Sequence, residues 1–118
     1  MAITKTALTF QASATNSAAG STLGTAVDLT DNLGTVISAK ITNGSTGPTL
    51  PCYFEVLVSN DDITYFTYCS LMSKLGNNEV TEFTITLPAE IMYAKTNFTG
   101  NTSQSVGIIA LGSELTSV

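Results

Sequence analysis

The sequence has no histidine, no arginine and no tryptophan. Without histidine, a chain cannot build Ser-His-Asp or Cys-His catalytic groups, and it loses a common zinc ligand and the commonest general base near neutral pH. Four glutamates could supply a glycosidase-like carboxylate pair, but their positions are typical of solvated strand edges and turns; they are Glu55, Glu79, Glu82 and Glu90. We therefore expect a protein that is not an enzyme, with no catalytic residue, no cofactor and no bound metal.

Charged side chains are also scarce, at 11% of the residues, against roughly 25% in typical soluble domains. The cations are four lysines and the net charge is −5; the lysines are Lys5, Lys40, Lys74 and Lys95. Such a chain cannot form a basic surface that follows a phosphate backbone, so we expect no nucleic-acid partner. No apolar run approaches the roughly 18 residues of a membrane span, so we expect no membrane partner.

The first residues, Met1–Lys5, show no basic segment followed by an apolar one, which a secretory signal would need. We therefore expect synthesis in the cytoplasm without a signal peptide. Asn-X-Ser/Thr sequons begin at Asn43, Asn97 and Asn101. Without a secretion route, we interpret them as turn residues rather than as glycosylation sites.

Apolar and polar residues alternate along nearly the whole chain, and no segment keeps the spacing of an amphipathic helix. Turn-forming pairs such as Asn43-Gly44 and Gly47-Pro48 separate the alternating stretches. We predict an all-β protein: a single domain over residues 1–118, folded as an antiparallel, jelly-roll-like β-sandwich of about eight short strands. The predicted strands cover residues 3–12, 25–30, 34–43, 50–59, 63–72, 79–88, 91–98 and 104–112.

Two segments lack strand periodicity. Residues 12–24 begin with the small, polar run Ala12–Ser21. We expect a flexible loop here, or an arm that becomes ordered against a neighbouring subunit. Residues 113–118 are expected to form a short C-terminal tail, with the same two interpretations.

The central hairpin is the best-defined unit of the sequence, with a predicted four-residue connection over Ser59–Asp62. The predicted cross-strand pairs are Val58 with Ile63, Val56 with Tyr65, Phe54 with Thr67 and Cys52 with Cys69. We expect the two cysteines to stay free and to pack as small hydrophobic residues, because the cytoplasm is reducing. The alternatives are a disulfide formed after release and a reactive cysteine, although no histidine is present to activate one.

The hairpin connection contains Asn60-Asp61-Asp62, three side chains with oxygen atoms. Such oxygens can bind calcium, but the sequence offers no supporting set of ligands. We therefore interpret this segment as a turn closed by Asx hydrogen bonds, with a weak structural calcium site as the alternative.

Three aromatic residues, Tyr53, Phe66 and Tyr68, are predicted on the outer face of the hairpin, which makes both of its faces partly apolar. One face of a two-layer sandwich should meet water. A second apolar face indicates burial within the fold, a subunit interface or a carbohydrate-binding platform. We name these three residues as a possible interface.

Within the segment Tyr53–Phe66, an alternating strand ends in Ser-x-Asp and aromatic residues open the return strand. This segment resembles the strand-turn-strand of small β-sandwich virion proteins of tailed bacteriophages. The stretch Tyr93–Thr102, followed by Ser105–Ala110, is similar to the closing hairpin of the same proteins. The resemblance spans roughly residues 50–112, about half of the chain.

The resemblance implies a non-enzymatic virion structural protein, most simply a capsid decoration or auxiliary head protein that assembles in multiple copies. A tail or fibre component is the next interpretation. Its partners would be other virion proteins and copies of itself, and its location would be the virion. A carbohydrate-binding module for cell-surface glycans and an accessory domain of a cytoplasmic enzyme are the alternatives from other functional classes.

Overall fold

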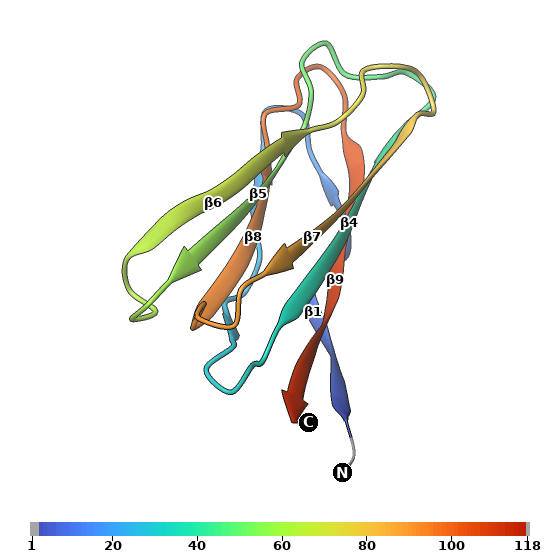
Figure 1. Ribbon diagram of the computed structural model, residues 1–118. Coiled ribbons are helices and arrows are strands. Elements are labelled where there is room, and N and C mark those ends of the chain that lie inside the picture. Colours follow the sequence, from blue (N-terminus) through green and yellow to red (C-terminus); the bar gives the residue numbers. More distant parts are fainter. Residues whose placement is uncertain (1–2, 118) are drawn as a thin grey trace.

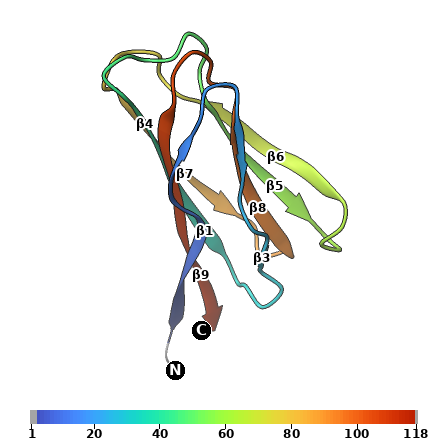
Figure 2. The same ribbon diagram turned by 180° about the vertical axis from the view of Figure 1, so that it is seen from behind.

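A computed structural model describes residues 3–117 of the chain (Figures 1 and 2). Its regular structure consists of nine strands in two facing antiparallel sheets, which confirms the predicted all-β sandwich. The strands are β1 (Thr4–Asn16), β2 (Ser21–Leu23), β3 (Val27–Asp28), β4 (Thr35–Asn43), β5 (Tyr53–Ser59), β6 (Tyr65–Met72), β7 (Val80–Leu87), β8 (Tyr93–Thr99) and β9 (Val106–Ser117). Within this range no helix is long and apolar enough to cross a membrane.

The order of the strands is that of a jelly roll. One sheet runs β1-β9-β4-β7, and the other runs β2-β8-β5-β6 with β3 also paired to β8. The strands pair as in one long antiparallel hairpin, in which each outer pair encloses the pairs inside it. From the innermost pair outward, the pairs are β5–β6, β4–β7, β3–β8, β2–β8 and β1–β9. This hairpin rolls up so that β9 also pairs with β4, and β8 with β5. Two sheets joined in this way form a jelly roll, as the sequence predicted.

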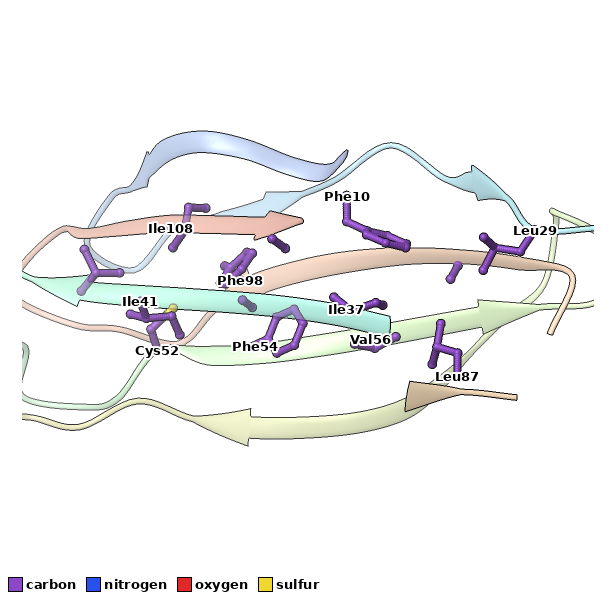
Figure 3. Packing of buried hydrophobic residues seen from close by; sticks show 14 residues of the cluster. Phe10, Leu29, Ile37, Ile41, Cys52, Phe54, Val56, Leu87, Phe98 and Ile108 are labelled. Atoms are coloured by element: carbon purple, nitrogen blue, oxygen red, sulfur yellow. The ribbon is translucent and has the colours of Figure 1, made fainter. Parts of the chain in front are cut away.

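The core lies between the sheets and follows from the alternation of residues along the strands. Every second residue of β4, from Thr35 to Asn43, is buried, and the residues between them are exposed. Phe10, Phe54 and Phe98 bring three fully buried rings from three strands into this layer (Figure 3). The Phe54 ring centroid lies 5.2 Å from that of Phe98 and 5.6 Å from that of Phe83, so Phe54 joins the two sheets.

Buried asparagines connect the loops at one end of the sandwich. The Asn16 side-chain amide donates a hydrogen bond of 2.6 Å to Asn101 Oδ1 and one of 3.1 Å to the Gly20 carbonyl. The Asn101 amide in turn donates to the Gln104 carbonyl at 2.9 Å. The backbone N–H of Ala19 donates to the Asn101 carbonyl at 2.7 Å. These bonds fix the β1–β2 turn against the β8–β9 loop.

The prediction of a flexible loop or arm at residues 12–24 is therefore wrong. β1 continues to Asn16, β2 covers Ser21–Leu23, and only residues 17–20 form the turn between them. The alternation is hard to recognise in the sequence because β1 pairs with β9 across register shifts between Thr9 and Gln11 and between Gln11 and Ala14. Each such shift moves the following side chains to the opposite face.

The predicted C-terminal tail at residues 113–118 is wrong for the same kind of reason. β9 extends from Val106 to Ser117, and its last part pairs with the beginning of β1 and with β4. The beginning of β1 and the end of β9 therefore lie side by side (Figure 1). Val118 lies outside the described residues.

Two of the three sequon asparagines are buried structural residues. Asn43, at the end of β4, donates to the carbonyls of Lys74 and Gly76 at 2.9 and 2.8 Å. Asn101 lies in the β8–β9 loop and makes the contacts described above. Asn97 instead lies within β8, where its amide donates to Glu55 Oε1 at 3.0 Å. Asn43 and Asn101 thus belong to strand ends and loops, as predicted, whereas Asn97 does not.

Candidate interaction surface

The β5–β6 hairpin has a different register from the predicted one. Ser59 is opposite Tyr65 and Val58 is opposite Phe66. The connection therefore covers the five residues 60–64 instead of the predicted four, and Val58 faces a residue three positions later than predicted. A second shift follows in β6, where Tyr68 is an extra residue between the pairs that face Leu57 and Val56. Together these shifts overturn the predicted pairs, including the pairing of Cys52 with Cys69.

Asp61 explains the longer connection. Its Oδ1 atom accepts hydrogen bonds of 2.9 Å from the backbone N–H groups of Ile63 and Thr64 and from the Ser59 hydroxyl. These hydrogen bonds lower the pKa of Asp61; the largest contribution comes from the Thr64 N–H, followed by the Ile63 N–H and the Ser59 hydroxyl. These bonds confirm the interpretation as an Asx-closed turn. In residues 3–117, no group of three or more acidic, cysteine or histidine side chains is placed to hold a metal ion.

The structure separates the three aromatic residues predicted to share the outer face. Tyr53 lies on that face, opposite Met72 and Thr99. Phe66 is opposite Val58, whose side chain packs against the core, so Phe66 belongs to the inner side of its sheet. The prediction of a shared outer face is wrong because the longer connection and the bulge change which residues point outward.

Tyr68, the extra residue of the bulge, reaches from one sheet to the other. Its hydroxyl donates a weak hydrogen bond of 3.5 Å to the carbonyl of Thr86 in β7. Tyr68, Phe66 and Tyr53 remain 44%, 62% and 37% exposed, respectively. They do not form one flat aromatic platform, because they occupy two sides of the sheet. Phe66 and Tyr68 instead mark the side of the sandwich where β6 and β7 are the edge strands (Figure 1).

The outer face of the β2-β8-β5-β6 sheet carries a cluster of polar groups that contact one another. Lys95 Nζ lies 3.9 Å from the centroid of the Tyr65 ring, in a cation–π contact. The Tyr65 hydroxyl donates to Asp62 Oδ1. Partial burial, and then Asp62, raise the pKa of Tyr65 to about 12. Sequence analysis missed this cluster, because its members lie on three segments that only the strand pairing brings together.

A second cluster missed by the sequence analysis contains Asp28, Asp31 and Glu114, which line a shallow depression with Thr30 and Thr116. Partial burial first, and then the two aspartates, raise the pKa of Glu114. Glu114 was expected in a tail, far from residues 28–31. The pairing of β9 with β4 brings it into this position.

The two cysteines are free, as predicted. Cys52 lies beside Ser73, with backbone and hydroxyl hydrogen bonds of 2.8 and 3.0 Å, whereas Cys69 faces Val56. The four-residue offset between positions 69 and 73 corresponds to roughly 13 Å of strand, beyond the ~7 Å Cα separation that a disulfide tolerates. Cys52 is fully buried, and burial raises the pKa of its thiol to about 11.

We expect Cys52 to resist alkylation in the native protein. The rise of its pKa from 9.0 to about 11 lowers the thiolate fraction at pH 8 about a hundredfold, and burial slows access further. A Cys69→Ser variant isolates the reaction of Cys52, and its labelling in urea gives the unprotected rate. Native and unfolded rates within a factor of about three would contradict the buried position of Cys52.

No protein-family model and no curated protein matches this sequence. Solved structures do match the fold. A chain from the structure of infectious bursal disease virus, Gx strain, has a TM-score of 0.60 and 8% identity, with 96% of this chain and 32% of that chain covered. A structure described as Bacillus endospore appendages that form a family of disulfide-linked pili has a TM-score of 0.55 and 12% identity, with 98% and 89% covered.

A third structure, of a CBM4 protein, has a TM-score of 0.55 and 16% identity, with 84% of this chain and 69% of that chain covered. This chain spans about a third of the viral chain and most of the pilus chain. At these identities the likeness extends to the β-sandwich fold. The fold is therefore one that occurs in a virus, in a pilus and in a protein of the CBM4 type.

Proposed function

We propose that this chain is a non-enzymatic structural protein of a virion, and specifically a capsid decoration or auxiliary head protein present in multiple copies. The observation that carries the proposal is the jelly roll that the strands form. It is similar to a chain of a virus structure over 96% of the length of the present chain. The likeness to a pilus structure adds a second case in which this fold serves an assembly. The partners would be other virion proteins and copies of this chain.

The surface also supports a role in assembly. The outer face of the β1-β9-β4-β7 sheet carries the exposed apolar residues Val36, Val80 and Leu111. Exposed apolar side chains that share one sheet face are typical of contact surfaces. The charge content of 11% leaves few charges to be desolvated when such a face is covered. Synthesis in the cytoplasm, followed by incorporation into the particle, is part of this proposal.

Quantitative mass spectrometry of density-purified particles tests this function. The copies of this chain are counted relative to the most abundant shell protein. Hundreds of copies per particle are the expected result for a decoration or auxiliary head protein. A handful of copies would move the chain to the tail or fibres, and absence from the particles would overturn the virion role.

A carbohydrate-binding module is the second candidate, favoured by the likeness to the CBM4 structure and by the exposed ring of Tyr53 beside the exposed Met72. Binding to a glycan array, lost in Tyr53→Ala and kept in Phe66→Ala, would support it. The two variants form a matched pair because both remove an exposed aromatic ring, from opposite sides of the sheet.

A further inference from the structure

Each sheet of the sandwich ends in edge strands, and edge strands carry unpaired backbone groups that can add a strand from another molecule. The edges at β1, β2, β3 and β6 each carry a feature that limits such pairing. β1 has three register shifts, β2 and β3 have three and two residues, and β6 contains the bulge at Tyr68. Bulges and very short strands are the usual means of protecting a sheet edge.

The edge at β7 has none of these features. It pairs with β4 in one unbroken register over its eight residues, from Val80 opposite Thr42 to Leu87 opposite Thr35. Its composition, Val-Thr-Glu-Phe-Thr-Ile-Thr-Leu, is rich in β-branched residues and contains neither proline nor lysine. A long, regular edge strand of this composition is suited to strand addition.

The backbone groups that point away from β4 can be identified. Asn43 N–H donates to the carbonyl of Glu79, the residue before β7, at 2.9 Å. Because hydrogen-bonded pairs alternate along an antiparallel ladder, the odd-numbered residues of β7 point their backbone N–H and C=O groups toward β4. The even-numbered residues therefore point their N–H and C=O groups to the open side; these are Val80, Glu82, Thr84 and Thr86. The Tyr68 hydroxyl reaches the Thr86 carbonyl at 3.5 Å, which agrees with this assignment.

We propose that β7 pairs antiparallel with β7 of a second copy of this chain and joins two four-stranded sheets into one of eight strands. In this pair, the core-facing residues of one β7 must lie opposite core-facing residues of the other. The N–H and C=O groups on the open side of each strand must also hydrogen-bond to one another. The register that pairs all four even-numbered residues places Phe83 opposite Phe83 of the second copy. In it, Glu82 lies opposite Thr84 and Val80 lies opposite Thr86.

The side chains fit this register. The half-buried Phe83 rings meet on the inner side, where Phe83 already stacks on Phe54 of its own chain. On the outer face the one charged residue, Glu82, is opposite a threonine of the second copy and has Lys40 of its own chain on its other side. No two like charges are directly opposed. The weak hydrogen bond from the Tyr68 hydroxyl to the Thr86 carbonyl breaks in both copies, because that carbonyl then accepts the N–H of Val80 of the other copy.

This contact deepens the proposed function and rests on it, because a particle that holds many copies supplies the high local concentration that strand addition needs. The two proposals fail separately. The dimer is measured on purified protein without particles, whereas the copy number is measured on particles without reference to any contact between copies.

Sedimentation over a dilution series tests the contact, with four proteins compared. Wild type is expected to form a dimer, and Thr84→Pro is expected to weaken it at least about tenfold, because proline removes the central N–H donor from the open edge and leaves the β4 ladder intact. Thr84→Val keeps that N–H and should dimerise. Ser38→Lys changes the exposed residue opposite Thr84 on β4, one strand away from the edge, and should also dimerise.

A wild type that stays monomeric at its highest soluble concentration would overturn the proposal, as would a Thr84→Pro dimer of unchanged strength. Loss of the dimer in Ser38→Lys would point to packing through the sheet face and would also overturn it. If Thr84→Pro does not fold, hydrogen exchange of wild type decides the question. The amides of Val80, Glu82, Thr84 and Thr86 should exchange at least about tenfold more slowly in concentrated than in dilute protein, and equal rates would contradict the edge contact.

Discussion

Phe54→Ala should lower the free energy of unfolding by about 4 kcal/mol. The Phe54 side chain is fully buried, and its ring contacts Phe98 of its own sheet and Phe83 of the other. Its truncation therefore removes apolar burial and two aromatic contacts, and it leaves a cavity where the two sheets meet. Urea unfolding followed by circular dichroism measures the change.

Phe66→Ala is the matched control for this substitution. It removes the same side chain from a position that is 62% exposed, and the expected loss is within about 1 kcal/mol. Equal losses in the two variants would contradict the arrangement of the sheets in Figure 3, where Phe54 lies between them.

Asn101→Ala should lower the free energy of unfolding by roughly 3 kcal/mol. The Asn101 side chain is fully buried, donates to the Gln104 carbonyl and accepts the amide of the buried Asn16. Alanine leaves these groups without their partner in a region closed to water, and an unsatisfied buried polar group costs more than an ordinary hydrogen bond contributes. The same unfolding experiment measures the loss.

Asn97→Ala is the control, because Asn97 is half-buried and its amide makes a single hydrogen bond, to Glu55. We expect a loss of less than about 1 kcal/mol. In addition, hydrogen exchange in Asn101→Ala should rise first in residues 17–20, since the contacts of Asn101 fix that turn. Unchanged exchange there would show that the asparagine network does not order the segment.

The sequence predicted the parts of the fold that depend on local alternation. β4 is the clearest case, because each residue from Ile37 to Thr42 lies on the face that its polarity indicates. The exceptions are the buried Thr35 and Asn43 at the two ends and the exposed Val36. A jelly-roll-like sandwich was also predicted, from the number of strands and their spacing, whereas the order of the strands within each sheet was not. Both predictions succeed because a two-residue period and a short turn are properties of neighbouring residues.

The parts that the sequence did not predict depend on residues far apart in the chain. Ala12–Asn16 form a strand because β9 pairs with them and because Asn101, 85 residues after Asn16, holds the turn that follows. The hairpin register depends on the hydrogen bonds of Asp61 and on the bulge at Tyr68, neither of which alters the composition of the segment. The register is displaced by three residues before the bulge and by four after it, which misplaced Phe66 and Tyr68.

The β7 edge illustrates the same limit. Its alternation was recognised in the sequence, but only the sheet order reveals that it is an edge and that the other edges are interrupted. Contact surfaces of this kind depend on which strands have a neighbour, and that follows from the topology of the whole chain.

Electron cryomicroscopy of density-purified particles tests the structural role most directly. The account predicts sandwich-shaped density that fits β1 to β9 at symmetry-related positions on the particle. Particles whose density is fully accounted for by other chains, at a resolution that separates strands, would contradict the role of this chain as a virion structural protein.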